Sequence, residues 1–346
     1  MASPGFPLRA AADGPRRIGM PRALLHYRYG TLWTTFFEAL GCDVVLSDPT
    51  DRSTVARGDA LSNDECCLAS KIYLGHVASL VNSGECDAVF VPSIANVGRR
   101  RGFCTKFQAL PDLVANTFAD QRIEVLSCLV NEVDEHKSMK DALIELATQR
   151  YTGPREAKRA WKAAARAQEQ AERAATLRQT RALSQLEAAR AAARRPEDAP
   201  LAILLAAHPY LAHDAFMGGA LTDLLESMNA VVLFADEADR ERSLQASFDF
   251  SDTLPWIVNR EIIGAITQLH HRVDGIVLVS AFPCGPDSMT DDAIVRCIQG
   301  KPVLNLTIDA QSGTAGLETR VESFIDILRY QKKGGLRWRL RRNATR

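Results

Sequence analysis

Two adjacent cysteines, Cys66 and Cys67, lie in the segment DECCLASKIYLGH, and nowhere else in the chain are two of the eight cysteines neighbours. Such a pair is consistent with a disulfide, a metal site, a nucleophile or simple packing. Cys67 is expected in the first turn of a helix that residues 62–64 can cap. A helix start and a nearby cation both lower the pKa of a thiol, and Lys71 follows by about one helical turn. Cys67 is therefore the first candidate for a reactive thiolate.

Two further cysteines follow predicted strands. Cys104 lies in RRRGFCTKF, where Arg101 and Lys106 add positive charge, and Cys284 lies in the loop PCGP after GIVLVSAF. Open α/β sheets bind their ligands at the carboxyl ends of the strands. Cys67 and these two residues could therefore converge on one edge as metal ligands. The alternative for the arginine run is an exposed, solvated loop.

The remaining cysteines are typical of packing. Cys66 is expected to pack or to support its neighbour, because adjacent helical residues point about 100° apart. Four others adjoin predicted strands or lie in an amphipathic helix and are expected as small buried residues: Cys42, Cys86, Cys128 and Cys297.

Three zones of sequence must position these residues. Residues 16–131 and 200–335 alternate short apolar runs, such as CDVVLS and VVLFAD, with amphipathic stretches, which is the pattern of a parallel sheet with crossover helices. Residues 132–199 include a long run of strong helix formers with leucines at 177, 183 and 186. We predict an α/β protein of two doubly wound, Rossmann- or flavodoxin-like parallel-sheet lobes joined by a long helical segment. The alternative for that segment is a partly disordered linker.

Composition excludes several classes of protein. The chain has 42 basic and 42 acidic side chains, which argues against nucleic-acid binding. No apolar run approaches the roughly 20 residues that cross a bilayer, and residues 1–17 lack the apolar stretch of a secretory signal. We expect a cytoplasmic protein, whose thiols stay reduced. The standard loops GxGxxG and GxxxxGK[ST] are also missing from the sequence.

Four motifs stand out within about residues 17–130 and 200–330: MPRALLHYRYGTLWTTFFEALG, DECCLASKIYLGHV, CGPDSM and GLETRVESFIDIL. They resemble the acyl-CoA dehydratase activase-related family, which is akin to the subunits of 2-hydroxyacyl-CoA dehydratases and to double-cubane-cluster proteins. The family's first cysteine, lysine and Gly-His map onto Cys67, Lys71 and Gly75-His76. Its later Cys-Pro-Lys-Phe maps onto residues 104–107, with Thr105 in place of proline. The proline after the first cysteine is also replaced, and DAQ at residues 309–311 stands where the family has DEH.

The resemblance implies a [4Fe–4S] or double-cubane iron–sulfur cluster held by Cys67, Cys104 and Cys284 between two similar lobes. Basic neighbours would compensate the negative charge of such a cluster: Lys71, Lys106 and Arg101. The implied electron donor is an ATP-dependent activase, and the implied acceptor is a small molecule or an acyl-CoA. A homodimer is also expected. His76 and His208 are the candidate catalytic residues, with an ordinary hydrogen-bonded helix position as the alternative for His76.

Three functions remain open at this point. Three thiolates leave one iron of a cubane without a protein ligand, where a reductase or a dehydratase-like enzyme can bind substrate. A second possibility is a non-catalytic electron relay or assembly protein. The third is a zinc or cluster-free protein that binds CoA-like ligands.

Overall fold

The N-terminal sheet has four parallel strands in the order β2-β1-β3-β5. They are β1 (Arg17–Met20), β2 (Asp43–Leu46), β3 (Ala88–Phe90) and β5 (Glu124–Leu126). The computed structural model describes residues 14–121, 123–195, 198–311 and 314–333. Most of the segment that bears on a secretory signal, residues 1–13, therefore lies outside the described residues. The apolar run CDVVLS contains β2, which is an edge strand with exposed ends, because within the described part of the chain it pairs with β1 alone.

Five helices and a small second sheet complete this lobe. The helices are α1 (His26–Ala39), α2 (Arg52–Ala60), α3 (Leu68–Ser83), α4 (Thr105–Gln108) and α5 (Leu110–Thr117). Strand β4 (Ser93–Asn96) follows β3, and strand β6 (Leu129–Asn131) follows β5. The two pair with each other in parallel. Gly41, just after α1, has a φ of +78°, a left-handed conformation that glycine adopts readily at the end of a helix.

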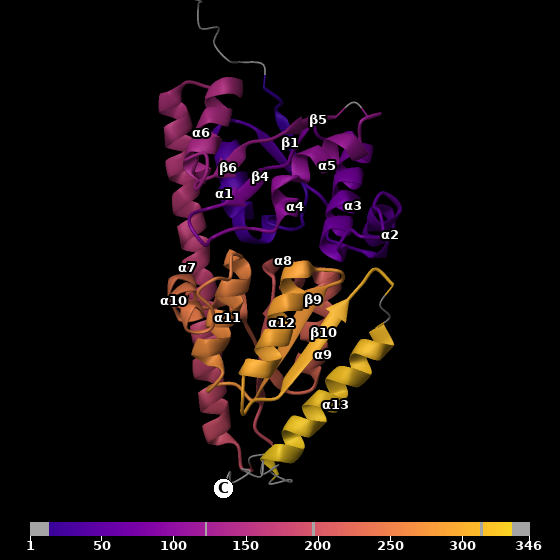
Figure 1. The fold of residues 1–346 in the computed structure, drawn as a ribbon, viewed down its shortest axis with the longest axis vertical. Coiled ribbons are helices and arrows are strands. Elements are labelled where there is room, and N and C mark those ends of the chain that lie inside the picture. Colours follow the sequence, from indigo (N-terminus) through magenta and orange to yellow (C-terminus); the bar gives the residue numbers. More distant parts are fainter. Residues whose placement is uncertain (1–13, 122, 196–197, 312–313, 334–346) are drawn as a thin grey trace, which may run out of the picture.

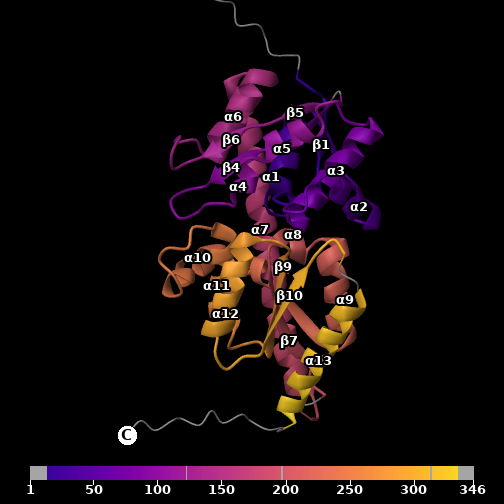
Figure 2. The ribbon, with the colours of Figure 1, turned by 45° about the vertical axis from the view of Figure 1, so that its right-hand side comes forward.

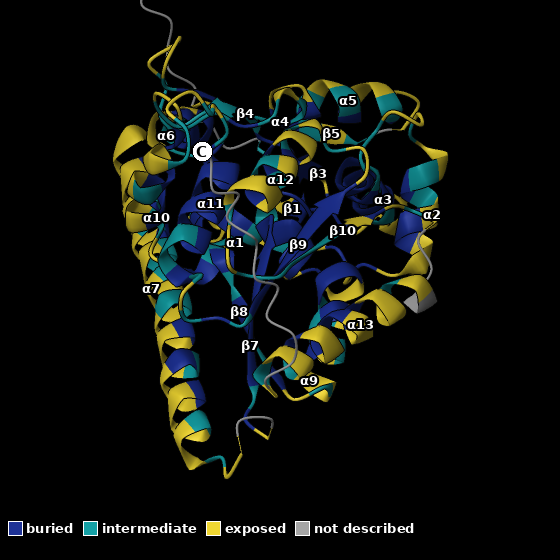
Figure 3. Ribbon diagram, turned by 60° about the horizontal axis from the view of Figure 1, so that its bottom comes forward, coloured by how far each residue is buried: buried dark blue, intermediate teal, exposed yellow. Residues whose placement is uncertain are grey.

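The C-terminal sheet is also parallel, in the order β10-β9-β7-β8. Its strands are β7 (Leu201–Ala207), β8 (Ala230–Phe234), β9 (Gly275–Ala281) and β10 (Val303–Ile308). Every residue of β7 and β9 is buried, as is typical of central strands covered on both faces. Figure 3 shows these strands inside a layer of helices with exposed outer faces. The helices of this lobe are α8 (Pro209–Ala212), α9 (Ala220–Ser227), α10 (Arg240–Ala246), α11 (Ile257–Leu269), α12 (Gly285–Cys297) and α13 (Thr314–Lys332), with short turns η1 (Ala215–Gly219), η2 (Ala235–Glu237) and η3 (Ser247–Asp249).

The two lobes repeat one arrangement. In each, the first strand lies between the second and the third, which is the flavodoxin-like order. In each, the helix before the third strand packs closely on the preceding helix through a glycine. A Cβ atom on Gly75 of α3 would lie 2.1 Å from the Thr54 carbonyl oxygen, and one on Gly264 of α11 would lie 1.7 Å from the Ser243 carbonyl oxygen. The prediction of two parallel-sheet lobes is therefore confirmed.

The predicted helical connector contains α6 (Met139–Arg150) and α7 (Pro154–Ala192). Helix α7 has 39 residues and is therefore about 58 Å long. It runs along the side of both lobes (Figures 1 and 2), so it is a continuous helix and not the alternative partly disordered linker. Among the described residues, no helix has both the length and the apolar character needed to span a bilayer.

Small residues let α7 pack on the first lobe. Ala157, Ala160 and Ala164 are buried on its N-terminal half, and Leu183 and Leu186 are buried further along. Leu177, which was expected in the same apolar stripe, is instead 55% exposed. The buried stripe thus consists of alanines where α7 meets α1 and of leucines near the second lobe.

Polar contacts also hold α7 to each lobe. The side chain of Gln168 donates to the Arg28 carbonyl oxygen at 2.8 Å and accepts from the Leu32 amide at 3.1 Å, both on α1. Gln179 accepts from the Phe234 amide of β8 at 2.8 Å. Helix α7 is therefore attached to both lobes along its length.

Buried side chains join the lobes directly. The guanidinium of Arg28 on α1 donates two hydrogen bonds to the Glu261 carboxylate on α11, at 2.5 and 2.8 Å, and both side chains are buried. Asp214, in the second lobe, accepts from the hydroxyls of Tyr27 and Thr50 in the first. These contacts fix the face at which the two sheets' carboxyl ends meet.

Candidate functional site

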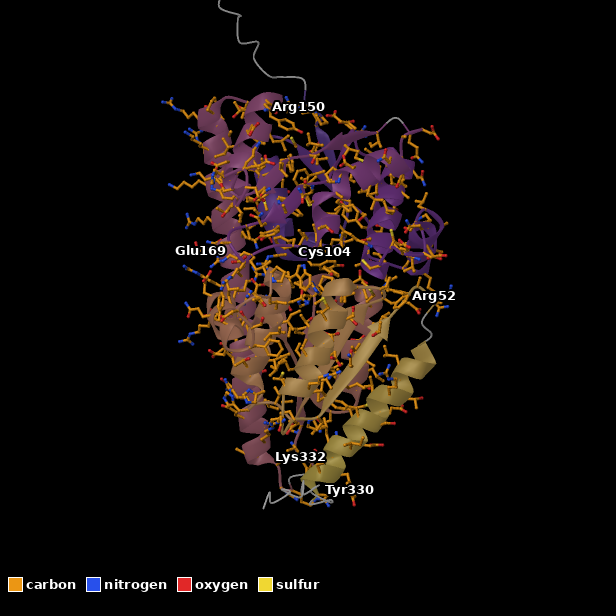
Figure 4. The ribbon with its side chains drawn as sticks, in the orientation of Figure 1. Arg52, Cys104, Arg150, Glu169, Tyr330 and Lys332 are labelled. Carbon is orange, nitrogen blue, oxygen red and sulfur yellow. The ribbon has the colours of Figure 1, made fainter. Side chains whose placement is uncertain are left out.

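A small cavity of about 40 Å³ lies between the lobes, and Cys67, Cys104 and Cys284 all line it. The three thiols are free and partly exposed. Figure 4 shows Cys104 at the level where the N-terminal lobe meets the C-terminal lobe. The structure thus brings together the three cysteines that the sequence placed at helix and strand ends.

Five helices begin at this cavity. Cys67, Cys104, His208, Trp256 and Cys284 are the residues immediately before α3, α4, α8, α11 and α12, and all five line the cavity. The start of a helix carries unpaired N–H groups and partial positive charge, which favour anionic groups. Cys67 was expected inside the first turn of its helix, but it occupies the cap position itself, so residues 62–64 do not cap that helix.

Backbone hydrogen bonds between the lobes hold the cysteine segments in place. The amide of Leu68, next to Cys67, donates to the Phe282 carbonyl oxygen, close to Cys284, at 2.8 Å. Near Cys104, Gly102 accepts from the Ile257 amide and donates to the Pro255 carbonyl oxygen, each at 2.9 Å. Each N-terminal cysteine segment is therefore tied to a C-terminal segment that lines the same cavity.

Aromatic and aliphatic side chains form most of the cavity wall: Leu24, Phe103, Phe107, Tyr210, Trp256 and Val258. Tyr210 is buried, and burial, followed by the negative charge of Asp287, raises the pKa of its phenol, which stays protonated. Sequence reasoning missed these residues. Trp256 had a usable signal, because it precedes the helix that corresponds to α3 in the second lobe.

His208 and Asp287 form a buried polar pair at the cavity. Nε2 of His208 lies 2.8 Å from Oδ1 of Asp287, and the side-chain amide of Asn259 donates to the same oxygen at 2.8 Å. Burial opposes ionisation of Asp287, but His208 and the donated hydrogen bonds outweigh it and lower its pKa. Asp287 lies in the first turn of α12, after Cys284. It binds His208, whereas Cys284 occupies the cap position.

The Cys284 thiol is protonated in the cavity as it stands. Burial raises its pKa, and the nearby Asp287 carboxylate raises it further. The charge of Cys67 acts in the same direction. A cationic partner would be needed to hold Cys284 as a thiolate.

Of the three basic residues predicted near the cluster, one lines the cavity and two do not. Lys106 lines the cavity, and its ammonium donates to the Glu65 carbonyl oxygen at 3.3 Å. The Lys71 ammonium binds the Asp59 carboxylate at 2.6 Å, and Arg101 lies 3.7 Å from Glu241 of α10. Lys71 and Arg101 are not among the lining residues.

The second candidate histidine lies away from the cavity. His76 is buried in α3, with Nδ1 and Nε2 each 2.9 Å from the hydroxyls of Ser47 and Thr50. Burial, followed by the charge of Arg22, lowers the pKa of His76 to about 4, so the ring is neutral at pH 7. This environment matches the alternative of a hydrogen-bonded helix residue.

The other cysteines do not line the cavity. Cys66 is half-buried beside Cys67. Cys42, Cys86 and Cys128 are buried, as expected of packing residues, whereas Cys297 is exposed, contrary to expectation. Cys297 is the last residue of α12, where the helix faces solvent.

The spacing of the donor side chains bears on the kind of group they could hold. Within the described ranges, no three His, Cys, Asp or Glu side chains lie close enough together to bind one metal ion. A zinc ion needs its thiolates within about 2.3 Å of one point, whereas an iron–sulfur cluster takes its cysteines on different iron atoms. Three cysteine thiols that line one cavity are chemically suited to hold such a cluster.

Comparison with known proteins identifies one family. A family model described as the CoA enzyme activase uncharacterised domain matches residues 17–237. No curated protein matches the chain. Among solved structures, a mutant of a Mn-bound periplasmic metal binding protein from Candidatus Liberibacter asiaticus is 13% identical, with 92% of this chain and 97% of that chain covered. Its TM-score is 0.26, so this similarity carries no argument.

Proposed function

The chain belongs to the family described as the CoA enzyme activase uncharacterised domain, and from that premise we propose that it is an iron–sulfur redox protein of an activase system. In this proposal it accepts low-potential electrons from an ATP-dependent activase. It then reduces or dehydrates a small or acyl-CoA substrate at an open iron site. The proposal includes a cytoplasmic location, and a homodimer remains a prediction.

One observation carries the proposal: Cys67, Cys104 and Cys284, from three distant parts of the sequence, line one cavity between the lobes. Cysteines kept only for packing have no reason to gather at a site bordered by five helix starts. Those helix starts and the Lys106 ammonium favour the negative charge of three thiolates. A reactive centre at the carboxyl ends of both sheets also agrees with where open α/β folds bind ligands.

The residues around the cavity would have two roles, to hold the cluster and to set its reduction potential. Cys67, Cys104 and Cys284 would hold the cluster, which supplies one-electron transfer and an iron without a thiolate for substrate oxygen. The aromatic wall excludes water and so disfavours added negative charge, which lowers a reduction potential. Lys106 acts in the opposite direction, because a nearby cation stabilises the reduced, more negative state.

Iron analysis tests this function. Protein purified without oxygen should contain iron and acid-labile sulfide and give an EPR signal after reduction. Cys67→Ser, Cys104→Ser and Cys284→Ser should each lose most of the iron. Cys42→Ser and Cys297→Ser are the controls and should keep it, because neither residue lines the cavity.

Retention of iron in all three single variants would overturn the proposal, as would protein that never contains iron or sulfide. Loss of iron from Cys66→Ser would instead show that the neighbour of Cys67 is also needed. The iron content therefore tests both the cluster and its ligand set.

A non-catalytic electron relay is the second candidate function. The observation that favours it is the unpaired Nδ1 atom of His208 at the same cavity, which can fill the position that catalysis needs open. Reduction by a partner activase with ATP, followed by assays with acyl-CoA and small acceptors, separates the two. Reduction without turnover of any acceptor would favour the relay.

A further inference from the structure

His208 lines the cysteine cavity and has a ring nitrogen without a partner among the described residues. The side chain is only 8% exposed, and Nδ1 is buried with no hydrogen-bond partner among the described residues. Leaving a buried polar atom unpaired costs about 1–3 kcal/mol. Such an atom in a cavity wall calls for a bound group that satisfies it.

The orientation of the His208 ring is fixed on its other sides. Nε2 lies 2.8 Å from the Asp287 carboxylate, and an ionised carboxylate can only accept, so Nε2 is the donor and Nδ1 is the nitrogen whose lone pair can bind a metal. Asn259 donates to the same carboxylate oxygen and holds it in place. The ring stacks on Tyr210, with centroids 4.9 Å apart and planes 24° apart. The lone pair is therefore held in a defined direction before any ligand arrives.

This arrangement is the one that metal-binding histidines use. Such a histidine donates one ring N–H to a carboxylate and binds the metal through the other nitrogen. The other polar side chains of the wall are less suited. Lys106 is a cation, the Ser70 hydroxyl lies 3.3 Å from the Cys67 sulfur, and Asn259 already donates to Asp287 and Thr290.

Resting on the proposed function, we propose that Nδ1 of His208 would be the fourth protein ligand of the cluster that Cys67, Cys104 and Cys284 would hold, and that it would give way to substrate. The ligand set is then three cysteines and one histidine. A neutral imidazole in place of a fourth thiolate leaves the centre less negative, which raises its reduction potential relative to a four-cysteine centre. His208 thus protects the open position in the resting protein.

Isotope labelling tests this ligand directly. The full chain is produced with ¹⁵N-histidine, purified without oxygen and reduced with dithionite, and pulsed EPR then measures nitrogen coupling to the unpaired electron. The wild-type protein should show coupling to one directly bound ¹⁵N, and His208→Ala should lose it. His213→Ala is the matched control and should keep the coupling, because His213 also lies 2.8 Å from a carboxylate but does not line the cavity.

A second variant tests the effect of His208 on the reduction potential. His208→Cys should retain the iron and show a lower reduction potential than the wild type, since it adds a fourth thiolate. Iron-loaded wild-type protein without strong ¹⁵N coupling, or His208→Ala with unchanged coupling, would overturn the histidine ligand and leave the proposed function standing. Protein without any iron or sulfide would overturn both.

Discussion

Asp287 illustrates, at the scale of single residues, how one carboxylate can organise a site that it does not itself line. It accepts from His208 and from Asn259 through one oxygen, and its position on α12 is three residues after Cys284. Any disturbance of Asp287 should therefore reach both the histidine and the cysteine. Such positioning groups are usually as important as the ligands that they orient.

Asp287→Asn should weaken iron binding by about 10- to 100-fold, because an amide is a poorer acceptor for the His208 N–H. Iron retained per chain during titration with a chelator measures this. Asp292→Asn on the same helix is the control, since Asp292 is exposed and pairs only with Arg296 among the described residues. Equal iron retention in the two variants would show that Asp287 does not position the site.

His76 should make the protein less stable in acid. Its pKa is about 4 in the folded chain and near 6.5 in the unfolded chain, so the unfolded state binds more protons between these values. Stability contributed by neutral His76 is therefore present above pH 6.5 and lost as pH falls to 4. In His76→Gln, the free energy of unfolding in urea should change less between pH 6.5 and 4.5, by roughly 1–3 kcal/mol. An unchanged slope would contradict the neutral, buried state of His76.

Sequence alone revealed the sulfur atoms of the site but not their surroundings. Cysteines are few, and their positions at strand ends and helix starts made Cys67, Cys104 and Cys284 recognisable. The pairing of His208 with Asp287 joins residues 79 positions apart, so no local pattern predicts it. Aromatic residues such as Trp256 and Phe107 are equally compatible with an ordinary core, and only the fold shows that they face a cavity.

At the scale of elements, the sequence of α7 predicts a helix but not which of its faces is buried. Its composition predicted a helix, because alanine, arginine, glutamate and glutamine all favour one. It did not predict the buried face, because alanine is as common on solvated helices as at close helix contacts. The two polar anchors, Gln168 and Gln179, are likewise indistinguishable in sequence from solvated glutamines.

Ala164→Leu should destabilise the protein by about 1–3 kcal/mol, because the larger side chain overfills the contact between α7 and α1. Ala164 is fully buried, whereas the adjacent Ala163 is exposed. Ala163→Leu is therefore the matched control and should change the free energy of unfolding by less than about 0.5 kcal/mol. If the two variants unfolded at the same urea concentration, the result would contradict the close packing of α7 on the first lobe.

At the scale of the whole molecule, a buried ion pair holds the two lobes together. Arg28 and Glu261 form a buried ion pair across the interface, and the cavity is built from both sides of the same interface. Removing one partner leaves an uncompensated buried charge. Removing both leaves an apolar contact that costs much less.

Arg28→Met and Glu261→Met should each destabilise the protein by about 3–5 kcal/mol, and the double variant should lose less than the sum of the two. Urea unfolding of the four proteins gives the coupling energy. Both single variants should also bind iron more weakly, because the lobes that carry the cysteines are no longer held together. Additive losses would mean that the pair does not stabilise the interface.

Because the three cysteines are divided between the lobes, the cavity is completed late in the synthesis of the chain. A ribosome has released Cys67 and Cys104 long before Cys284, which lies 180 residues after Cys104. The backbone hydrogen bond from Gly102 to Pro255 needs part of the second lobe, and the one from Leu68 to Phe282 cannot form until the segment that carries Cys284 emerges. A nascent chain therefore has no complete cavity, and under the proposed function the cluster would be loaded only after Cys284 has emerged.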